Sequence, residues 1–374
     1  MTKILLFSFF SGCGFLDLGF EWSGFRIGFV NEINPSFMNA YRYARGRMAS
    51  TGNGYTHEYP EYGYSTCDIN DFMDVKRNIL EGYIESARSN GYAVGFIGGP
   101  PCPDFSIAGK NRGRDGHNGQ LSLSYIKLIT CMKPDFFLFE NVKGLWSTAR
   151  HREYFEELRK ELESAGYVTS SCLKNAMEYG VPQDRNRIFL FGVKKTLNPK
   201  RATDGDLDFP WNTGRQYTMD YICGIPWPRR EPFITGSLKS KPDGIIDELT
   251  VEYWFRKNNV YTHPNASDYF LPRNGLEKMQ TVDEGDTGRK SYKRLHRWRY
   301  SPTAAYGNNE VHLHPYLARR LSVAEALAIQ GLPAGFVLPP DMSLTDKFKT
   351  VGNGVPFGLA RGLAEGVSEL MGSL

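Results

Sequence analysis

The sequence lacks any long apolar run, because no stretch of its 374 residues reaches the ~18 apolar residues that a membrane-spanning helix needs. Residues 4–10 are apolar and lie near the start, but no small-x-small cleavage site of a signal peptide follows them. We therefore expect residues 3–10 to form the first core strand, and we expect no association with a membrane.

Cysteine is scarce as well, since the six cysteines stand apart at positions 13, 67, 102, 131, 172 and 223. The sequence contains no Cys-x-x-Cys pair, which argues against structural zinc and a disulfide framework and indicates a reduced, intracellular protein. His312 and His314 have no third ligand nearby, so no metal site is predicted. The formal net charge of +4 is too small to indicate a polyanionic partner by itself.

The stretch from residue 93 to residue 106 contains the candidate nucleophile. Residues 94–97 form a short apolar run bounded by glycines, which predicts a buried strand. Pro100 and Pro101 stiffen the exit from that strand, so the position of Cys102 is set by the backbone. A cysteine in this position is either a nucleophile or an inert small hydrophobe. Residues 109–119, with four glycines and three cations, predict either a disordered surface loop or a cationic lid.

The first 32 residues predict a strand–turn–helix–strand unit, with strands at 3–10 and 26–30 and a helix at 15–22. Gly12 and Gly14 occupy the first turn, and Glu32 follows Gly12 by 20 residues, a spacing that suits a carboxylate on ribose hydroxyls. Asp17 stands where the dinucleotide fingerprint has its third glycine and would repel a pyrophosphate. We therefore expect a nucleoside ligand without phosphates, of which S-adenosyl-L-methionine is the commonest.

Helices and strands alternate through the next 160 residues. The pattern predicts helices at 36–45, 75–89, 121–132 and 153–164, and strands at 66–69, 134–142, 169–175 and 187–193. Two strands end in an acid, Asp68 and Glu140, each of which is either a ligand-binding group or a helix cap. In an open α/β sheet the ligand lies outside the carboxyl ends of the strands, so Cys102, Glu140, Glu32 and Asp68 should share one edge. Arg185 and Arg187 should project to one side of their strand, toward a carboxylate or phosphate or toward solvent.

The alternation of helices and strands stops between residues 195 and 316. There we expect a smaller domain that is low in helix and has β-prone pieces at 252–255 and 302–306. The run 289–299 holds six Lys or Arg, no acid, and interleaved Tyr292 and Trp298, which suits either a solvated face or a phosphate backbone. Ser322 and Glu325 form a capping box that opens a helix over 322–329, and a last helix is predicted over 357–371.

Taken in order, these segments resemble the motifs of the DNA (cytosine-5)-methyltransferases of bacterial and phage restriction-modification systems. The matching segments are 10–14, Asn31-Glu32, 67–69, Gly99-Pro-Pro-Cys102 with Ser106, 140–142, Gln183-x-Arg185-x-Arg187, Arg320-Leu-Ser with Glu325 and Gln330-Gly331, and 352–356. Two positions depart from the family pattern. Phe15 replaces a glycine, which is expected to tighten the cofactor pocket, and Pro103-Asp104 replaces the usual Gln-x after the cysteine.

The resemblance implies a mechanism and a set of site residues. Cys102 would add to C6 of a flipped-out cytosine, Glu140 would hold the N3/N4 edge, and Arg187, supported by Arg185, would orient both. The residues implied for S-adenosyl-L-methionine are Phe10, Gly12, Gly14, Glu32, Ile33, Asp68, Ile69, Pro100, Leu121, Asn353 and Val355. Those implied for DNA contact are Ser106, Arg112, Gln183, Arg294, Arg297, Arg299 and Thr303, the last beside Ala304 in a Thr-aliphatic pair.

The predicted fold is α/β, with a Rossmann-like methyltransferase sheet covered by helices on both faces and a smaller, mostly β or irregular, target-recognition domain. The catalytic domain would span 1–194 and be completed by 345–374, and the recognition domain and hinge would span 195–344, including the return helix 322–330. We expect a prokaryotic, cytoplasmic monomer that binds double-stranded DNA, with or without a cognate restriction endonuclease. An RNA cytosine-5 methyltransferase, a catalytically silent DNA-binding regulator and a nicotinamide oxidoreductase are the alternatives, and Asp17 argues against the last.

Overall fold

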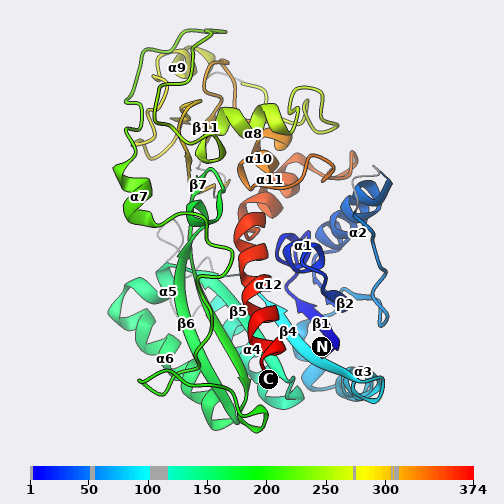
Figure 1. The fold of residues 1–374 in the computed structure, drawn as a ribbon. Helices are drawn as coiled ribbons and strands as arrows, with labels where there is room; N and C mark the ends of the chain where they lie inside the picture. Colours follow the sequence, from blue (N-terminus) through cyan, green and yellow to red (C-terminus); the bar gives the residue numbers. More distant parts are fainter. Residues whose placement is uncertain (1–2, 51–54, 102–116, 273–274, 305, 307–310) are drawn as a thin grey trace.

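The computed structural model describes residues 3–50, 55–101, 117–272, 275–304, 306 and 311–374 (Figure 1). A lobe built on a large sheet forms one end of the molecule, and a lobe of short helices and loops forms the other (Figure 1). No helix in the described ranges is long and apolar enough to cross a membrane.

The large sheet has seven strands in the order β3-β2-β1-β4-β5-β8-β6. Their bounds are β1 Lys3–Phe9, β2 Arg26–Asn31, β3 Tyr64–Ser65, β4 Tyr92–Gly98, β5 Phe136–Val142, β6 Tyr167–Asn175 and β8 Asn186–Lys194. Pairing is parallel from β3 to β5, whereas β8 runs antiparallel to both β5 and β6. The central strands are apolar almost throughout, as a sheet covered on both faces requires.

Helices cover both faces of the sheet, as the sequence predicted. Side chains of α3 (Arg77–Ser89), α4 (His117–Met132) and α6 (Ala149–Ser164) form one core cluster with Leu5, Phe7 and Phe9 of β1. Side chains of α1 (Phe15–Trp22), α2 (Pro35–Ser50) and α12 (Phe357–Gly372) form the opposite cluster with Leu6. The alternation along β1 sends successive side chains to opposite faces, so each face has its own core.

The C-terminal helix completes the sheet lobe. In Figure 1, α12 (red) runs from the irregular lobe down beside α1 (blue). The two helices approach so closely that a Cβ on Gly19 would lie 2.4 Å from Cβ of Ala360. The segment after β8 also packs on the sheet, because the ring of Phe209 lies 4.5 Å from the ring of Phe191.

The second lobe consists of short elements joined by long loops. They are η4 (Lys195–Leu197), α7 (Met219–Gly224), η5 (Asp247–Leu249), α8 (Val251–Lys257), α9 (Leu276–Gln280), β9 (Lys293–Arg294), β10 (Ser301–Pro302) and β11 (His312–Leu313). The connecting elements elsewhere in the chain are η1 (Ile69–Met73), α5 (Gly144–Ser147), η3 (Ala176–Tyr179), β7 (Gln183–Asp184), α10 (Val323–Ile329) and α11 (Leu344–Asn353). The capping box predicted at Ser322 and Glu325 opens α10.

Three local predictions were wrong. Within the β-prone piece 302–306, only Pro302 belongs to a strand, β10, and Thr303, Ala304 and Tyr306 have no strand pairing. Residues 252–255 belong to helix α8, because Thr250 caps the backbone N–H of Tyr253 and the buried residues Val251, Trp254 and Phe255 repeat at helical spacing. Residues 66–69 are not a strand. Strand β3 ends at Ser65, and Asp68 then caps the 3₁₀ turn η1.

Helix α10 joins the two lobes. Val323, Ala326 and Leu327 belong to a core cluster with α1, α2 and α11 of the sheet lobe. Ala324 and Ala328 belong to a second cluster with α8. A single seven-residue helix is therefore buried by both lobes at once.

Candidate active site

The carboxyl ends of parallel strands β3, β2, β1, β4 and β5 meet at one edge of the sheet. Glu32 follows β2, Asp68 follows β3, and Glu140 lies near the end of β5. Pro100 is buried just beyond β4 and Pro101 is exposed. Cys102 comes next and lies outside the described residues, as do Ser106 and Arg112.

The end of β5 carries a buried ion pair. Nε of Arg187 lies 2.9 Å from Oε1 of Glu140. The pair forms because β8 runs antiparallel to β5, with Arg187 opposite Val142, two residues from Glu140. Burial raises the pKa of Glu140, and the nearby Arg187 and Arg185 only partly offset this effect. Glu140 therefore holds a proton to a higher pH than an exposed glutamate does.

Gly99 and Asn141 connect this carboxyl group to the strand that leads to Cys102. A Cβ on Gly99 would lie 2.5 Å from Oε2 of Glu140, so only glycine allows this approach. Nδ2 of Asn141 lies 3.5 Å from the carbonyl oxygen of Pro100. These contacts fix the distance between Glu140 and the Pro100-Pro101 exit.

Arg185 is fully buried and joins three parts of the chain. Its Nη1 donates to the carbonyl of Ala304 (3.1 Å), and its Nη2 donates to the carbonyl of Gly352 (2.7 Å). Nε of Arg185 is buried without a hydrogen-bond partner among the described residues. Arg185 therefore supports the backbone around the Glu140–Arg187 pair, and no direct hydrogen bond joins it to Glu140 within those residues.

Glu32 stands at the first turn of the chain. Its Oε2 accepts from the backbone N–H of Gly12 and its Oε1 from that of Asn34, both at 2.8 Å. Each carboxylate oxygen has a second lone pair, so Glu32 can accept two further hydrogen bonds without releasing the backbone. Burial raises its pKa. Two fixed acceptors side by side match the two hydroxyls of a ribose.

Ile33, next to Glu32, is 55% exposed. An aromatic ring that lay over Ile33 would cover this apolar surface. Oδ1 of Asp68 accepts from both nitrogens of Asn70, so Asp68 is a cap whose Oδ2 takes no part in capping. An adenosyl group fits this set of donors, acceptors and apolar surface.

The other residues predicted for the cofactor lie around the same edge. Ile69, Pro100 and Val355 are buried, Phe10 and Leu121 are half-buried, and Asn353 is exposed at the end of α11. The ring of Phe10 lies edge-on to Tyr125. Gly12 and Gly14 both have positive φ angles, and a Cβ on Gly14 would lie 2.4 Å from the ring of Tyr41.

Phe15, which departs from the family pattern, is accommodated by a glycine elsewhere. Its ring is buried, packs edge-on against Phe336, and occupies the space beside Gly354. A Cβ on Gly354 would lie 2.0 Å from the Phe15 ring. The ring thus packs in the core under the Gly354 turn, which explains how the chain tolerates it.

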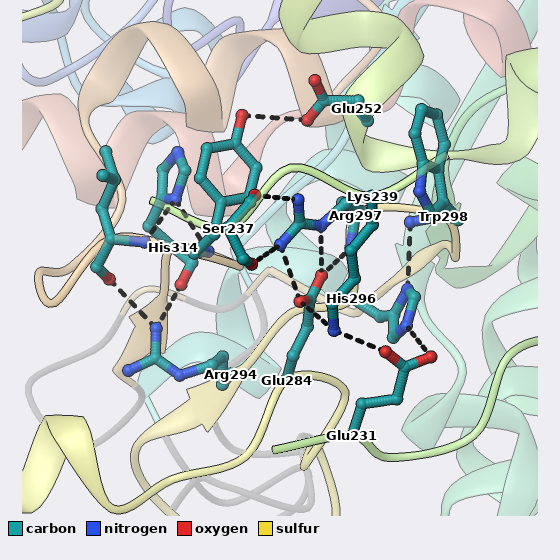
Figure 2. A network of polar contacts seen from close by, with 12 residues as sticks. Glu231, Ser237, Lys239, Glu252, Glu284, Arg294, His296, Arg297, Trp298 and His314 are labelled. Carbon is teal, nitrogen blue, oxygen red and sulfur yellow. Dashed lines mark hydrogen bonds and ion pairs between the residues drawn. The ribbon is translucent and has the colours of Figure 1, made fainter. Parts of the chain in front are cut away.

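Three residues predicted to contact DNA are buried within the protein, and Figure 2 shows two of them, Arg294 and Arg297. Gln183 is fully buried and donates to Oε1 of Gln330 (3.3 Å). Arg294 is buried and donates to backbone carbonyls, and buried Arg297 pairs with Glu284 at 2.8 Å. A guanidinium that is enclosed in this way does not reach a phosphate. The cationic run 289–299 is therefore not simply a solvated face.

Arg299 and Thr303 lie closer to the surface. Arg299 is half-buried, and its guanidinium lies 5.0 Å from the Tyr300 ring centroid. Thr303 donates through Oγ1 to the carbonyl of Asp184 (2.6 Å), the residue before Arg185.

Sequence reasoning missed Arg45, the cation beneath the first turn of the chain at residues 11–14. Arg45 is fully buried and donates to the carbonyls of Cys13 (3.2 Å) and Gly14 (2.9 Å). It also pairs with Glu21 at 2.9 Å and stacks on Tyr41. The available signal was a cation four residues after Tyr41, on the apolar face of α2.

A family model described as C-5 cytosine-specific DNA methylase matches residues 4–369. The chain is 55% identical to the Type II methyltransferase M.NmeDI of Neisseria meningitidis serogroup C, over 97% of this chain and 83% of that protein. It is 32% identical to the Type II methyltransferase M.FnuDI of Fusobacterium nucleatum, over 98% and 94% of the two chains.

Solved structures share the fold. A putative DNA modification methyltransferase encoded within an Escherichia coli prophage superposes with a TM-score of 0.64 at 21% identity, over 99% of both chains. The Dnmt2 methyltransferase of S. pombe superposes with a TM-score of 0.58 at 13% identity, also over 99% of both. At these identities the likeness concerns the fold alone.

Proposed function

The chain belongs to the C-5 cytosine-specific DNA methylase family, and from this membership we propose how its residues methylate DNA. It is a DNA (cytosine-5)-methyltransferase related to Type II restriction-modification enzymes, and it uses S-adenosyl-L-methionine. The observation that carries the mechanism is the buried Glu140–Arg187 pair, which lies against Gly99 at the exit of the strand that leads to Cys102.

Cytosine C5 is a poor nucleophile, and the proposed chemistry activates it by covalent addition. The thiolate of Cys102 forms a bond to C6, and the electron pair of the C5–C6 double bond moves to C5, which can then attack an electrophilic methyl group as the bond between that methyl carbon and its sulfur breaks. Loss of the C5 proton restores the double bond and expels the thiolate. The thiolate must reach C6 and the methyl group must reach C5 over the faces of the ring, which stacking covers, so the base must leave the stacked duplex.

Glu140 and the two arginines support this addition. Protonated Glu140 would donate to cytosine N3 and so stabilise the negative charge that develops on the ring when the thiolate adds. The raised pKa of Glu140 favours that protonated form. Arg187 would orient the carboxyl group and the base, and Arg185 would position Arg187 by bracing the backbone at Ala304 and Gly352.

S-adenosyl-L-methionine supplies the electrophilic methyl group when it is bound. Glu32 would accept the ribose hydroxyls, Ile33 would cover one face of the adenine, and Oδ2 of Asp68 would accept from its amino group. The remaining residues of the proposed site are Phe10, Gly12, Gly14, Ile69, Pro100, Leu121, Asn353 and Val355.

The proposed DNA contacts are Ser106, Arg112, Arg299 and Thr303. The Type II relatives support duplex DNA over RNA as the substrate. We further propose that the enzyme is a monomer that works on nucleoid DNA in a prokaryotic cytoplasm, where a cognate endonuclease would cut the same unmethylated sequence.

Radiolabelled methyl transfer to unmethylated duplex DNA, followed by sequencing of 5-methylcytosine, tests the proposal. We expect label at C5 of cytosine within one short sequence context. Cys102→Ala should abolish transfer and retain cofactor binding, whereas Glu32→Ala should weaken cofactor binding first. Label on RNA alone would contradict the DNA substrate, and substantial turnover by Cys102→Ala would contradict the covalent step.

A further inference from the structure

Gly354 stands between Asn353 and Val355, two residues proposed for the cofactor, and its own backbone does not require glycine. Its φ of −64° and ψ of 149° are extended values that any residue adopts. A glycine that is needed for its conformation has a positive φ, as Gly14 does at 80°. The reason for a glycine at position 354 therefore lies in the atoms that surround it.

The ring of Phe15 occupies the space that a side chain at position 354 would fill. A Cβ on Gly354 would lie 2.0 Å from Cδ2 of Phe15, 2.6 Å from Cε2 and 2.8 Å from Cγ. Carbon atoms in van der Waals contact lie about 3.5–4.0 Å apart, so all three ring atoms would overlap with the new carbon. Phe15 is only 2% exposed, and its ring packs edge-on against Phe336 with 5.2 Å between centroids. The ring therefore has no open space into which it could turn.

Phe15 is tied closely to the first turn of the chain, at residues 11–14. It is the first residue of α1, and Gly14 precedes it as the N-cap. The carbonyl of Gly14 accepts from the backbone N–H of Leu18 at 2.9 Å, which fixes the start of the helix to the turn. In the same turn, the backbone N–H of Gly12 donates to Oε2 of Glu32. The Phe15 ring is thus carried by the turn that contacts the proposed ribose acceptor.

The residues just before Gly354 are held by other parts of the chain. The carbonyl of Val351 accepts from Nε2 of Gln330 at 2.6 Å. The carbonyl of Gly352 accepts from Nη2 of Arg185 at 2.7 Å. The end of α11 is therefore anchored to the buried junction between the lobes, and the Phe15 ring lies between the segment 353–355 and the first turn.

Close packing makes the volumes at positions 15 and 354 complementary. Protein interiors have few voids, so an added methyl group at 354 has to push the backbone away from the ring. Loss of the ring at 15 has the opposite effect, because it leaves a cavity into which the segment 353–355 can move. The two changes made together oppose each other, since the methyl group then enters space that the ring has left.

We propose that Phe15 is a positioning residue for the methyl donor, because its ring sets the distance between the first turn and the segment 353–355. Gly354 is the steric complement of that ring. The inference rests on the proposed function, which places S-adenosyl-L-methionine between Gly12 and Gly14 on one side and Asn353 and Val355 on the other. Phe15 acts through these two segments and does not itself touch the cofactor.

The test is a double-mutant cycle on the affinity of the full chain for S-adenosyl-L-methionine, measured by isothermal titration calorimetry. Gly354→Ala should weaken binding about tenfold, because the methyl group displaces the segment 353–355. Phe15→Ala should weaken binding about fivefold, because the segment loses its spacer. The variant with both changes should bind within about threefold of wild type, whereas independent effects would multiply to about fiftyfold. The KM for the cofactor in methyl transfer should follow the same order.

Phe20→Ala is the matched control for the loss of a buried ring. Phe20 is on the same helix, is fully buried, and packs against Phe25 with 5.2 Å between ring centroids. Its removal should lower thermal stability and leave cofactor affinity unchanged. Phe20→Ala combined with Gly354→Ala should bind as weakly as Gly354→Ala alone, because the space it opens lies elsewhere.

Losses that multiply when Phe15→Ala and Gly354→Ala are combined would overturn the inference. Wild-type affinity in Gly354→Ala would also overturn it, and this variant keeps the test decisive if Phe15→Ala does not fold. The wild-type chain separates the two levels of inference. Failure of wild type to bind S-adenosyl-L-methionine would overturn the proposed function, whereas normal wild-type binding with multiplied losses would overturn the role of Phe15 alone.

Discussion

At the scale of single residues, the mechanism proposed for this chain requires Glu140 to be protonated when the thiolate of Cys102 adds to the cytosine. Because burial raises its pKa, the protonated form persists to a higher pH than in an exposed glutamate, and activity should fall as pH rises through that value. Glu140→Gln cannot supply the proton. We expect its single-turnover rate to be about 10²- to 10⁴-fold lower and its profile to lose the alkaline decline. An alkaline limb that persisted in this variant would assign the decline to another group.

Gly99 determines how closely Glu140 approaches the Cys102 strand. In Gly99→Ala the new methyl group would meet Oε2 at 2.5 Å and push the carboxyl group away. We expect the methyl-transfer rate to fall up to about 10²-fold, as for other small misplacements, with cofactor affinity unchanged. Gly82→Ala in α3 is the matched control, because its Cβ would meet nothing within 4 Å. If Gly99→Ala kept the wild-type rate, Glu140 would not lie this close to residue 99 in the active enzyme.

At the scale of elements, α2 supports the turn at residues 11–14, which we propose binds the cofactor, through Arg45. Arg45→Met would remove the donors to Cys13 and Gly14 and leave the Glu21 carboxylate buried without its cation. Breaking such a pair typically costs about 3–5 kcal/mol of unfolding free energy. We expect thermal stability to fall and KM for S-adenosyl-L-methionine to rise, with kcat less affected.

Two further variants separate these roles. Arg47→Met, on the exposed side of the same helix, should leave both quantities unchanged. Arg45→Lys keeps the positive charge but not the forked set of N–H donors. It should therefore restore part of the lost stability, and it should reverse the rise in KM to a smaller extent. A normal KM in a destabilised Arg45→Met would show that the arginine supports the core without positioning the turn.

The elements also show which features the sequence could reveal. The alternation of apolar runs and turns predicted the sheet and its helices, because each strand of the central sheet is buried on both faces and reads as a continuous apolar run. The same reasoning mistook α8 for a strand, because a seven-residue helix offers only two turns of periodicity. Its Thr250 cap was the stronger signal.

Burial of charge was harder to foresee. Arg294 and Arg297 stand in a run with no acid, so the sequence suggested a surface. Their partners, backbone carbonyls and Glu284, come from segments that only the folded lobe brings together. Arg45 was missed for the same reason, since Glu21 is 24 residues away in the chain.

At the scale of the whole molecule, the two lobes are joined by polar contacts as well as by α10. Gln183 and Gln330 meet in the core, and Nε2 of Gln330 donates to the carbonyl of Val351. Arg185 binds Ala304 on one side and Gly352 on the other. Arg185, Ala304 next to Thr303, and Gly352 near the end of α11 thus share one buried junction, so a movement of the irregular lobe would displace the backbone around the Glu140–Arg187 pair.

Two buried histidines make the stability of this assembly depend on pH. Burial lowers the pKa of His312 to about 3 and that of His314 to about 4, below the ordinary value of 6.5. Both side chains are therefore neutral in the folded chain, whereas the unfolded chain takes up protons below about pH 6.5. The free energy of unfolding is therefore highest above pH 6.5, where both histidines are neutral in either state. It decreases as the pH falls from 6.5 toward the pKa values of the histidines in the folded chain.

We expect the free energy of unfolding to fall by about 1.4 kcal/mol per pH unit for each histidine between roughly pH 6 and 4.5. His312 is the residue to change, because neither ring nitrogen has a hydrogen-bond partner among the described residues, and the charge of Lys293 further disfavours its protonation. His312→Leu should reduce the slope of the unfolding free energy against pH by about 1.4 kcal/mol per pH unit, the contribution of one histidine. It should leave the stability at pH 8 nearly unchanged. His117→Leu, at the start of α4 in the sheet lobe, controls for loss of a histidine elsewhere. Urea unfolding at several pH values measures the slope, and an equal slope in His312→Leu and wild type would mean that His312 titrates normally in the folded protein.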